Sequence, residues 1–272
     1  MGWDELTTEQ RRKLAILLAE ERLPIINQKL STVQPSKTLY ARYIKRVIDV
    51  IVSGIGLLVT LPINCLIGII TFFDVGRPIF FKQERIGKDE KPFTLIKFRN
   101  MRNDRDENGD LLPASIRVTK IGRFVRKTSL DELLNLWSVF KGDMSLIGPR
   151  PLLPQYLDRF NIRHRCRFYV RPGLECPPRE AIDGEWTWQE RFENDVWYVE
   201  NLSFLVDCKM VINMFRYAFD PKMSSMRAGA RLGTFMGYSL DGIAITKDDI
   251  EDRYFEMMAN QKMEPVLEGQ NA

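Results

Sequence analysis

The sequence contains very little histidine and cysteine. Its 272 residues include one histidine, His164, and four cysteines without any Cys-x-x-Cys pair. This composition excludes a zinc site of the usual spacing, because such sites need closely paired His and Cys ligands. We expect the cysteines to be reduced thiols facing the cytosol; they are Cys65, Cys166, Cys176 and Cys208. His164 lies in the basic run RHRCR, where we expect a ring exposed to solvent or lipid headgroups and not a general base.

The chain also lacks internal repeats, a secretory cleavage pattern and a recognisable nucleic-acid motif. Its net charge of +4 and isoelectric point near 8.8 indicate a mild preference for anionic partners, among which phosphates and lipid headgroups are candidates. We expect no nucleic-acid partner, because the basic residues gather around one long apolar segment.

That apolar segment covers residues 47–73, with Asp49 as its only charge. A straight helix of this length would rise on the order of 40 Å, enough to cross a hydrocarbon core of about 30 Å. Pro62 lies near its centre, where it removes a backbone donor and favours a bend, and Thr60 and Asn64 offer side chains to the displaced carbonyl. The segment therefore predicts a membrane helix that bends near its middle.

The residues alone leave three placements of this segment open. Basic residues flank it on both sides; they are Lys37, Arg42, Lys45 and Arg46 before it, and Arg77, Lys82, Arg85, Lys88 and Lys91 after it. The positive-inside tendency would keep both ends in the cytoplasm, which favours a re-entrant helix with two arms of roughly 20 Å over a full span. A buried helix of a soluble domain is the weakest alternative, because the run is long and strongly basic at its ends.

The two ends of the chain have different patterns. Residues 4–30 predict an amphipathic helix with a capping box between Thr7 and Gln10 and an interruption at Pro24. From about Asp220 onward, no apolar period is sustained.

Two further stretches carry local signals. Residues 79–87 and 91–101 predict two short strands around a polar turn at 88–90, which together form a hairpin. Residues 155–170 mix aromatic residues with four arginines. That mixture fits an interfacial helix lying on anionic headgroups, or a solvated basic face.

Residues 128–153 place two adjacent carboxylates, Asp131 and Glu132, before a helical pattern of leucines and aromatics. Ser129 and Glu132 have the spacing of a capping box, so a helix over 130–141 is expected whether the acidic pair is a cap or a site. A carboxylate in the first turn of a helix is expected to stay ionised, and the exposed amides of that turn attract phosphate. Taken alone, this stretch favours a structural cap.

Five separated motifs resemble one known family. They are QERIG, KFRNM, SLDEL, KGDMSLIGPRPLL and RPGL, and they follow a proline-bearing apolar segment in that order. Over about residues 40–215 the chain resembles the bacterial sugar transferase family of monotopic phosphoglycosyl transferases. The resemblance implies an α+β, mostly helical monotopic membrane protein with a re-entrant membrane helix, interfacial amphipathic helices and a small β-hairpin. It divides the chain into an amphipathic N-terminal extension at 1–36, a transferase domain at 37–219 and a C-terminal extension at 220–272.

The resemblance also implies an activity and a site. Members of the family transfer a sugar 1-phosphate from a UDP-sugar to polyprenyl (undecaprenyl) phosphate and release UMP, a first membrane step of glycoconjugate assembly. Asp131 would be the nucleophile, forming an aspartyl phosphosugar intermediate in a ping-pong reaction, with Glu132 beside it. Mg²⁺ is expected on the phosphates, with Asp131 as its protein ligand. The expected phosphate-binding side chains are Lys97, Arg126 and Arg150, followed at second rank by Arg99, Gln83 and Arg85.

The implied location is the cytoplasmic face of the bacterial inner membrane, in contact with membrane lipids. The extensions at the two ends of the chain are the expected places for self-association into a homo-oligomer. The motifs specify neither the sugar nor the pathway that the enzyme serves.

The sequence departs from the family pattern in two places. Leu134 and Asn135 stand where the family has Pro-Gln, which would alter the entry into the helix. After Gly173, the run LECPPREAIDGEWTW replaces a Thr-Gly-Trp-like run and an Asn-Gly-Arg, so an atypical donor preference or a rebuilt loop is expected. If donor binding were lost there, the chain would be a catalytically silent membrane-surface scaffold or regulator with the same fold.

Overall fold

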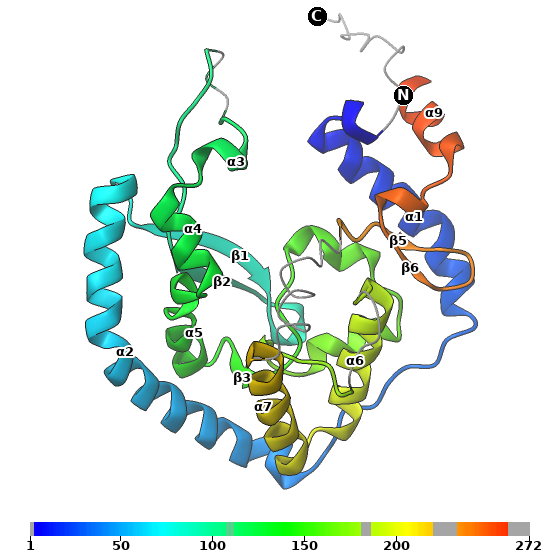
Figure 1. Cartoon of the computed structure of the whole chain (residues 1–272). Helices are drawn as coiled ribbons and strands as arrows, with labels where there is room; N and C mark the ends of the chain where they lie inside the picture. Colours follow the sequence, from blue (N-terminus) through cyan, green and yellow to red (C-terminus); the bar gives the residue numbers. More distant parts are fainter. Residues whose placement is uncertain (1–2, 108, 110, 181–185, 220–232, 261–272) are drawn as a thin grey trace, which may run out of the picture.

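The computed structural model describes residues 3–107, 109, 111–180, 186–219 and 233–260. These residues are mostly helical and include three two-stranded sheets (Figure 1). The helices are α1 (Thr8–Asn27), α2 (Lys45–Val75), α3 (Ala114–Arg117), α4 (Lys120–Lys127), α5 (Asn135–Lys141), α6 (Trp188–Asn201), α7 (Phe204–Phe219) and α9 (Asp252–Asn260). The strands are β1 (Phe80–Ile86), β2 (Pro92–Phe98), β3 (Ser145–Ile147), β4 (Gly173–Glu175), β5 (Gly237–Tyr238) and β6 (Ala244–Ile245). The predicted mostly helical α+β class is confirmed.

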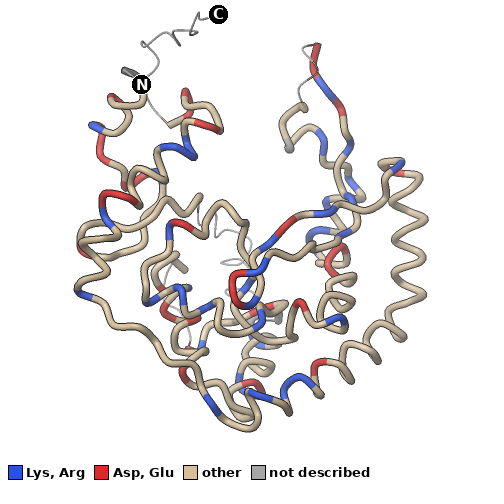
Figure 2. The backbone as a smooth tube through the Cα atoms, turned by 180° about the vertical axis from the view of Figure 1, so that it is seen from behind, with Lys and Arg blue, Asp and Glu red and all other residues tan. Residues whose placement is uncertain are grey.

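Helix α2 is long and apolar enough to cross a membrane, as judged by length and composition. It changes direction near its middle, in the part of the helix that contains Pro62 (Figure 1). Thr60 Oγ1 donates to the Gly56 carbonyl at 2.7 Å and accepts from Asn64 Nδ2 at 3.2 Å, so polar side chains line the bend as predicted. Charged residues lie toward the two ends of the helix and leave its middle apolar (Figure 2).

Much of the apolar surface of α2 is left uncovered by the part of the chain that the structure describes. Leu58 is 75% exposed and Phe73 is 81% exposed. A soluble protein rarely leaves a contiguous apolar surface of this kind open to water, so the outer face of α2 is suited to lipid. The predicted alternative of a helix buried within the protein is therefore wrong for the described residues.

Both ends of α2 are fixed to the rest of the protein. At the first end, Lys45 Nζ pairs with Asp207 Oδ2 of α7 at 2.5 Å. At the other end, the Arg99 guanidinium donates to the carbonyls of Val75 and Gly76, where a cation complements the helix dipole. Both ends of the helix are thus held by polar contacts with other elements of the chain.

The predicted hairpin is confirmed. Strands β1 and β2 pair antiparallel, with Phe80 opposite Phe98 and Ile86 opposite Pro92. The turn between them is a short 3-10 helix over Lys88–Glu90.

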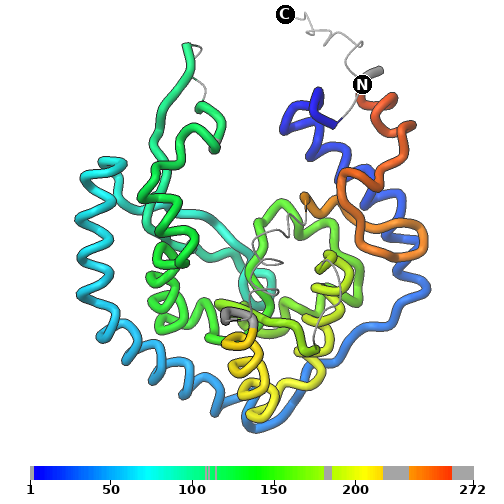
Figure 3. Tube along the Cα trace, in the orientation of Figure 1, coloured from blue at the N-terminus to red at the C-terminus, as the bar shows by residue number. Residues whose placement is uncertain are grey.

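The N-terminal and C-terminal segments pack against each other, as the blue and orange-red parts of Figure 3 show. Leu14 and Leu18 of α1 share a core cluster with Tyr254 and Met258 of α9. Helix α9 lies in the stretch after 220 that shows no sustained apolar period, because it buries an apolar face over a single short helix, too little sequence to reveal a period.

Helix α1 follows the prediction at its start and departs from it later. Thr7 and Gln10 form the predicted capping box. Pro24 lies inside the helix, which continues to Asn27, so the predicted interruption is wrong. Arg22 of α1 is buried and donates to the Tyr238 carbonyl at 2.9 Å and to Glu251 Oε2 at 2.6 Å, which ties the two terminal segments together.

Residues 155–170 do not form the predicted interfacial helix or a solvated basic face. They form two 3-10 turns, Pro154–Arg159 and His164–Tyr169, with buried aromatic and arginine side chains. Phe160 packs edge-on against Phe192 at a ring distance of 5.2 Å and also contacts Phe235. These partners lie far along the sequence, so the aromatic residues belong to the core.

His164 is buried, contrary to the expectation of an exposed ring. It is 2% exposed and lies between the Tyr238 hydroxyl at 2.8 Å and Glu193 Oε1 at 2.9 Å. Burial lowers the pKa of His164, although Glu193 opposes that shift. The neutral ring, donating to Glu193 and accepting from Tyr238, satisfies both nitrogens.

Candidate active site

The Asp131–Glu132 pair lies in a tight turn and not in the first turn of an α-helix. Residues Leu130–Glu132 form a 3-10 turn, and α5 begins at Asn135. Ser129 has a left-handed backbone with φ of 56° and caps nothing with its side chain. The predicted capping box and the helix start at 130 are therefore wrong, because Glu132 is drawn to cations elsewhere in the fold.

All eight side chains predicted for the site line one cavity of about 870 Å³. The eight are Gln83, Arg85, Lys97, Arg99, Arg126, Asp131, Glu132 and Arg150. Strand periodicity explains part of this convergence, since alternate residues of a strand share a face. Phe81, Gln83 and Arg85 are alternate residues of β1 and share one face of the hairpin. Lys97 of β2 lies opposite Phe81, so its side chain points to the same face.

Glu132 is held by two cations. Its Oε1 accepts from Lys97 Nζ at 2.6 Å and from Arg150 Nη2 at 2.8 Å. Arg150 also pairs through Nη1 with Glu175 Oε2 at 3.3 Å. Burial alone would raise the pKa of Glu132, but Arg150 and Lys97 outweigh it and hold that pKa below its ordinary value. Glu132 is therefore ionised at neutral pH and fixes the position of both cations.

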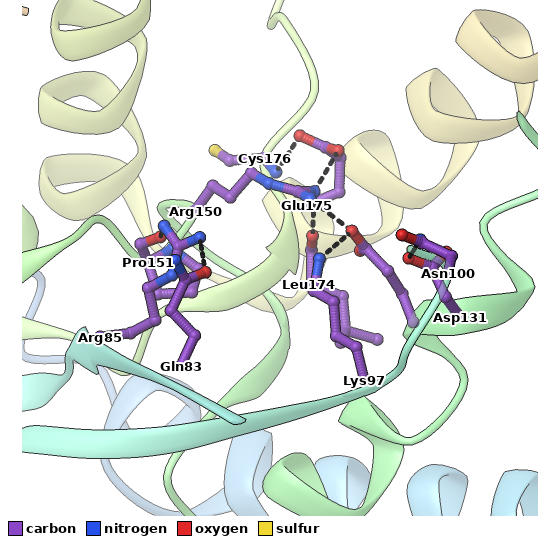
Figure 4. A network of polar contacts seen from close by, with 11 residues as sticks. Gln83, Arg85, Lys97, Asn100, Asp131, Arg150, Pro151, Leu174, Glu175 and Cys176 are labelled. Carbon is purple, nitrogen blue, oxygen red and sulfur yellow. Dashed lines mark hydrogen bonds and ion pairs between the residues drawn. The ribbon is translucent and has the colours of Figure 1, made fainter. Parts of the chain in front are cut away.

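Asp131 has a different environment from its neighbour. It is 6% exposed, and its Oδ2 accepts from Asn100 Nδ2 at 3.2 Å (Figure 4). Burial raises the pKa of Asp131; Lys97 opposes this shift and the charge of Glu132 adds to it. No α-helix begins here, so the predicted stabilisation of its charge by a helix terminus is absent. A partly desolvated carboxylate with a raised pKa is a more basic group and a candidate nucleophile.

The remaining predicted cations occupy different positions around the cavity. Arg126 lies near Asp131, and its charge is among those that oppose the rise in the pKa of Asp131 that burial causes. Arg85 donates to Gln83 Oε1 at 2.6 Å and to the Pro151 carbonyl at 3.1 Å. Arg99 lines the cavity, but its guanidinium holds the end of α2, so its contacts are those of a structural cation.

Sequence reasoning missed several side chains of the cavity. Asn100 lies within the KFRNM motif, three residues after Lys97, and that position was the available signal. Glu175 and Arg191 also line the cavity, and both come from or follow the stretch that departs from the family pattern. Burial lowers the pKa of Arg191, and the charge of Glu175 opposes the shift. The described residues of the atypical stretch thus contribute to the lining of the same cavity.

The carboxylates of the cavity are the possible protein ligands of a magnesium ion. Within the described ranges, no group of three or more His, Cys, Asp or Glu side chains is placed to hold a metal ion. Mg²⁺ is commonly bound by one or two carboxylates together with substrate phosphates and water. Asp131 suits that mode, whereas Glu132 is already engaged by two cations. The site fits an ion held chiefly by phosphate oxygens.

Comparison with known proteins places the chain in a family. Residues 40–220 match the family described as bacterial sugar transferase. The chain is 49% identical over 141 residues to the uncharacterized sugar transferase EpsL of Bacillus subtilis strain 168, covering 50% of this chain and 68% of that protein. It is 44% identical over 124 residues to a putative undecaprenyl-phosphate N-acetylgalactosaminyl 1-phosphate transferase of the same organism, covering 44% and 69%.

A third relative has a longer chain. The protein is 32% identical over 196 residues to the UDP-N-acetylgalactosamine-undecaprenyl-phosphate N-acetylgalactosaminephosphotransferase of Aeromonas hydrophila, covering 69% of this chain and 46% of that one. The fold, the cavity and these matches define the class: the chain belongs to the bacterial sugar transferase family. Within that family it is an enzyme of the phosphoglycosyl transferase type.

Proposed function

We propose that this enzyme transfers a sugar 1-phosphate from a UDP-sugar to undecaprenyl phosphate and releases UMP. The observation that carries the proposal is the position of Asp131, a buried carboxylate in a cavity that also holds Lys97, Arg126 and Arg150. Cations in a partly desolvated cavity stabilise phosphoryl transfer, in which negative charge must be neutralised as it moves. The names of two relatives support undecaprenyl phosphate as the acceptor, and the name of the Aeromonas hydrophila relative supports a UDP-sugar as the donor.

The first step is attack by an Asp131 carboxylate oxygen on the phosphorus that carries the sugar. A bond forms between this oxygen and that phosphorus. The bond from the phosphorus to the bridging oxygen breaks, and UMP leaves with the electron pair. The product on the enzyme is an aspartyl phosphosugar.

The second step returns Asp131 to its starting state. A phosphate oxygen of undecaprenyl phosphate attacks the same phosphorus, and the bond to the Asp131 oxygen breaks with its electron pair on the carboxylate. The lipid then carries a diphosphate linked to the sugar. Two displacements at one phosphorus give ping-pong kinetics. Both steps use the same cations, so one cavity serves donor and acceptor in turn.

Glu132 has a supporting role in this proposal. Because its carboxylate holds Lys97 and Arg150 at 2.6 and 2.8 Å, the two cations are already in place before the substrate binds. Preorganised charges cost no reorganisation during the reaction. Mg²⁺, held by Asp131 and the phosphates, would neutralise further charge on the diphosphate.

We also infer that α2 enters the cytoplasmic leaflet of the inner membrane and returns to the same side. A single full span would separate the ends of α2 by the thickness of the bilayer. Lys45 near one end pairs with Asp207, and Arg99 holds the other end, so both ends are attached to the rest of the chain. The bend in the part that contains Pro62 agrees with two short arms (Figure 1). This topology would bring the cavity to the cytoplasmic headgroup region, where a lipid phosphate lies.

A panel of nucleotide sugars tests the proposed activity. Purified enzyme in nanodiscs is incubated with undecaprenyl phosphate, Mg²⁺ and each common UDP-sugar, and UMP release is measured. We expect release with at least one donor, dependent on the lipid for more than one turnover. Lipid-independent steady release of UMP would contradict the transfer. If no donor yields UMP, the alternative of a catalytically silent scaffold or regulator would be favoured.

A further inference from the structure

The membrane helix contacts the segment that joins two halves of the candidate site. This segment runs from Glu132 through α5 and β3 to Arg150, and its two ends meet in the ion pair of 2.8 Å. Its middle lies against α2, which packs extensively on α5. Contacts that fix α5 and β3 therefore affect the geometry of the ion pair between Glu132 and Arg150.

Arg46 of α2 holds the end of α5. Its Nη1 donates to the Val139 carbonyl at 2.7 Å and its Nη2 to the Phe140 carbonyl at 2.8 Å. The last carbonyls of a helix have no partner within the helix, and a cation there also complements the helix dipole. Gly142 ends α5 with φ of 107°, and a Cβ at this position would lie 3.2 Å from the Arg46 guanidinium. The chain thus reverses directly against Arg46.

Asp49 of α2 holds β3. It is 3% exposed, and its Oδ1 accepts from Ser145 Oγ and from the Leu146 amide, both at 3.0 Å. Asp49 follows Arg46 by three residues, so the two side chains share one face of the helix. Burying a carboxylate in an apolar helix costs free energy unless the carboxylate is hydrogen-bonded. The two hydrogen bonds therefore explain why a charged residue is tolerated at position 49 of α2.

Two glycines let α5 approach α2 closely. A Cβ at Gly54 would lie 3.3 Å from the ring of Phe140, and one at Gly56 would lie 3.1 Å from Leu136. Close backbone approach limits the freedom of α5 to slide along α2. The contacts of Arg46 and Asp49 then set the register of the two helices.

We propose that Arg46 and Asp49 form a clamp through which the membrane helix positions Arg150 against Glu132. The expected effect of this clamp on kcat rests on the proposed function. Asp49 fixes β3, β3 leads into the turn that carries Arg150, and Arg46 fixes the helix that follows Glu132. Arg46 and Asp49 are positioning residues and do not line the cavity. The seating of α2 in the membrane is thereby linked to the geometry of the phosphate-binding cations.

Three variants in nanodiscs test the clamp. Asp49→Leu removes the acceptor, Asp49→Asn keeps an acceptor oxygen, and Lys141→Ala is the matched control, because it breaks an ion pair with Asp143 in the same region. Hydrogen exchange is followed at the amides of Leu146 and Gly148. The α6 amides report whether the variant is folded. Initial rates give kcat and KM for the UDP-sugar.

We expect Asp49→Leu to lose protection at Leu146 and, by loosening β3, at Gly148, with α6 unchanged. Its kcat should fall by about 100-fold with little change in KM, because a misplacement of about 1 Å can cost that much. Asp49→Asn should retain most of the amide protection and most of the wild-type kcat. Lys141→Ala should resemble wild type in both measurements. Unchanged exchange, or lost protection with an unchanged kcat, would overturn the clamp.

The result also separates this inference from the proposed function. If wild-type enzyme transfers no sugar phosphate from any donor, the proposed function fails and exchange alone decides the clamp. In that case, loss of protection that spreads from Leu146 to Gly148 supports it, and loss confined to Leu146 overturns it. Should Asp49→Leu unfold, as exposed α6 amides would reveal, Ser145→Ala removes one of the two hydrogen bonds to Asp49 and is read by the same criteria.

Discussion

One oxygen of Glu132 accepts hydrogen bonds from both Lys97 and Arg150, at 2.6 and 2.8 Å. Lys97 belongs to strand β2, and Arg150 belongs to the turn after β3, so the carboxylate joins two parts of the fold. Asp131, the next residue in the chain, contacts Asn100 and is buried. The environments of the two neighbours push their pKa values apart, which is the arrangement expected when adjacent carboxylates have different roles.

Glu132→Gln should destabilise the fold in a pH-dependent manner. The pKa of Glu132 is lowered in the folded state, so its charge stabilises the fold above the unfolded pKa of about 4.3, and this stabilisation is lost as pH falls through the lower folded value. We expect a loss of about 1.5–3 kcal/mol at pH 7, typical of hydrogen bonds to a charged group. The measurement is denaturant unfolding at pH 7 and below pH 4. A difference of equal size at both pH values would contradict the assignment.

Asp131→Asn should raise thermal stability at neutral pH. Burial raises the pKa of Asp131, so the group favours the folded state when protonated, and this contribution is lost as pH rises through the raised pKa. The uncharged amide of Asn does not titrate and avoids this loss of stability. The stability difference between Asp131→Asn and wild type should therefore shrink toward zero in acid. Melting temperatures at pH 7 and pH 4 check this, with Asp143→Asn, a carboxylate outside the cavity, as control. A lower melting temperature for Asp131→Asn at pH 7 would indicate a structural role instead.

The acid limb of the turnover profile should report Asp131. A nucleophilic carboxylate must be ionised, so kcat should fall as pH drops through its pKa, at a pH above the ordinary Asp value of about 3.9. Asn100→Ala removes a hydrogen bond that favours the ionised form, so the limb should move to higher pH. The measurement is kcat against pH for both proteins. If the acid limb of the kcat profile lies at the same pH in Asn100→Ala as in wild type, a group other than Asp131 controls it.

Replacing Pro62 by Leu should alter the topology of α2. The substitution restores a backbone donor and removes the ring that displaces a carbonyl, so the helix should straighten toward a full span. Introduced cysteines at Lys37 and Arg77 are labelled from outside intact cells, in a background where the exposed Cys65 is replaced by Ser. Neither site should react in the parent, and one should react in Pro62→Leu. Outside labelling of one site in the parent would contradict the re-entrant helix.

The sequence predicts those elements whose cause is local. The hairpin follows from strand alternation around the polar turn at Lys88–Glu90, and that alternation also places Gln83, Arg85 and Lys97 on one face. The apolar helix with Pro62 is equally local, because length, composition and one proline define it. The convergence of the predicted side chains on one cavity came from the family motifs, since spacing alone left a structural cap favoured.

Elements decided by distant contacts were not predictable from the sequence. Ser129 and Glu132 have the spacing of a capping box, but Lys97 and Arg150 draw the Glu132 carboxylate away and the chain turns through a left-handed Ser129. Residues 155–170 have the composition of an interfacial helix, yet Phe192 and Phe235 bury them. In both cases local propensity gave way to tertiary packing.

The covalent role of Asp131 is tested most directly by the intact mass of the protein after incubation with a UDP-sugar, Mg²⁺ and no lipid acceptor. Wild type should gain the mass of one sugar phosphate, located at Asp131 by peptide mapping and removed when undecaprenyl phosphate is added. Asp131→Asn should gain nothing and turn over no substrate. An adduct on any other residue, or persistent turnover by Asp131→Asn, would contradict the mechanism.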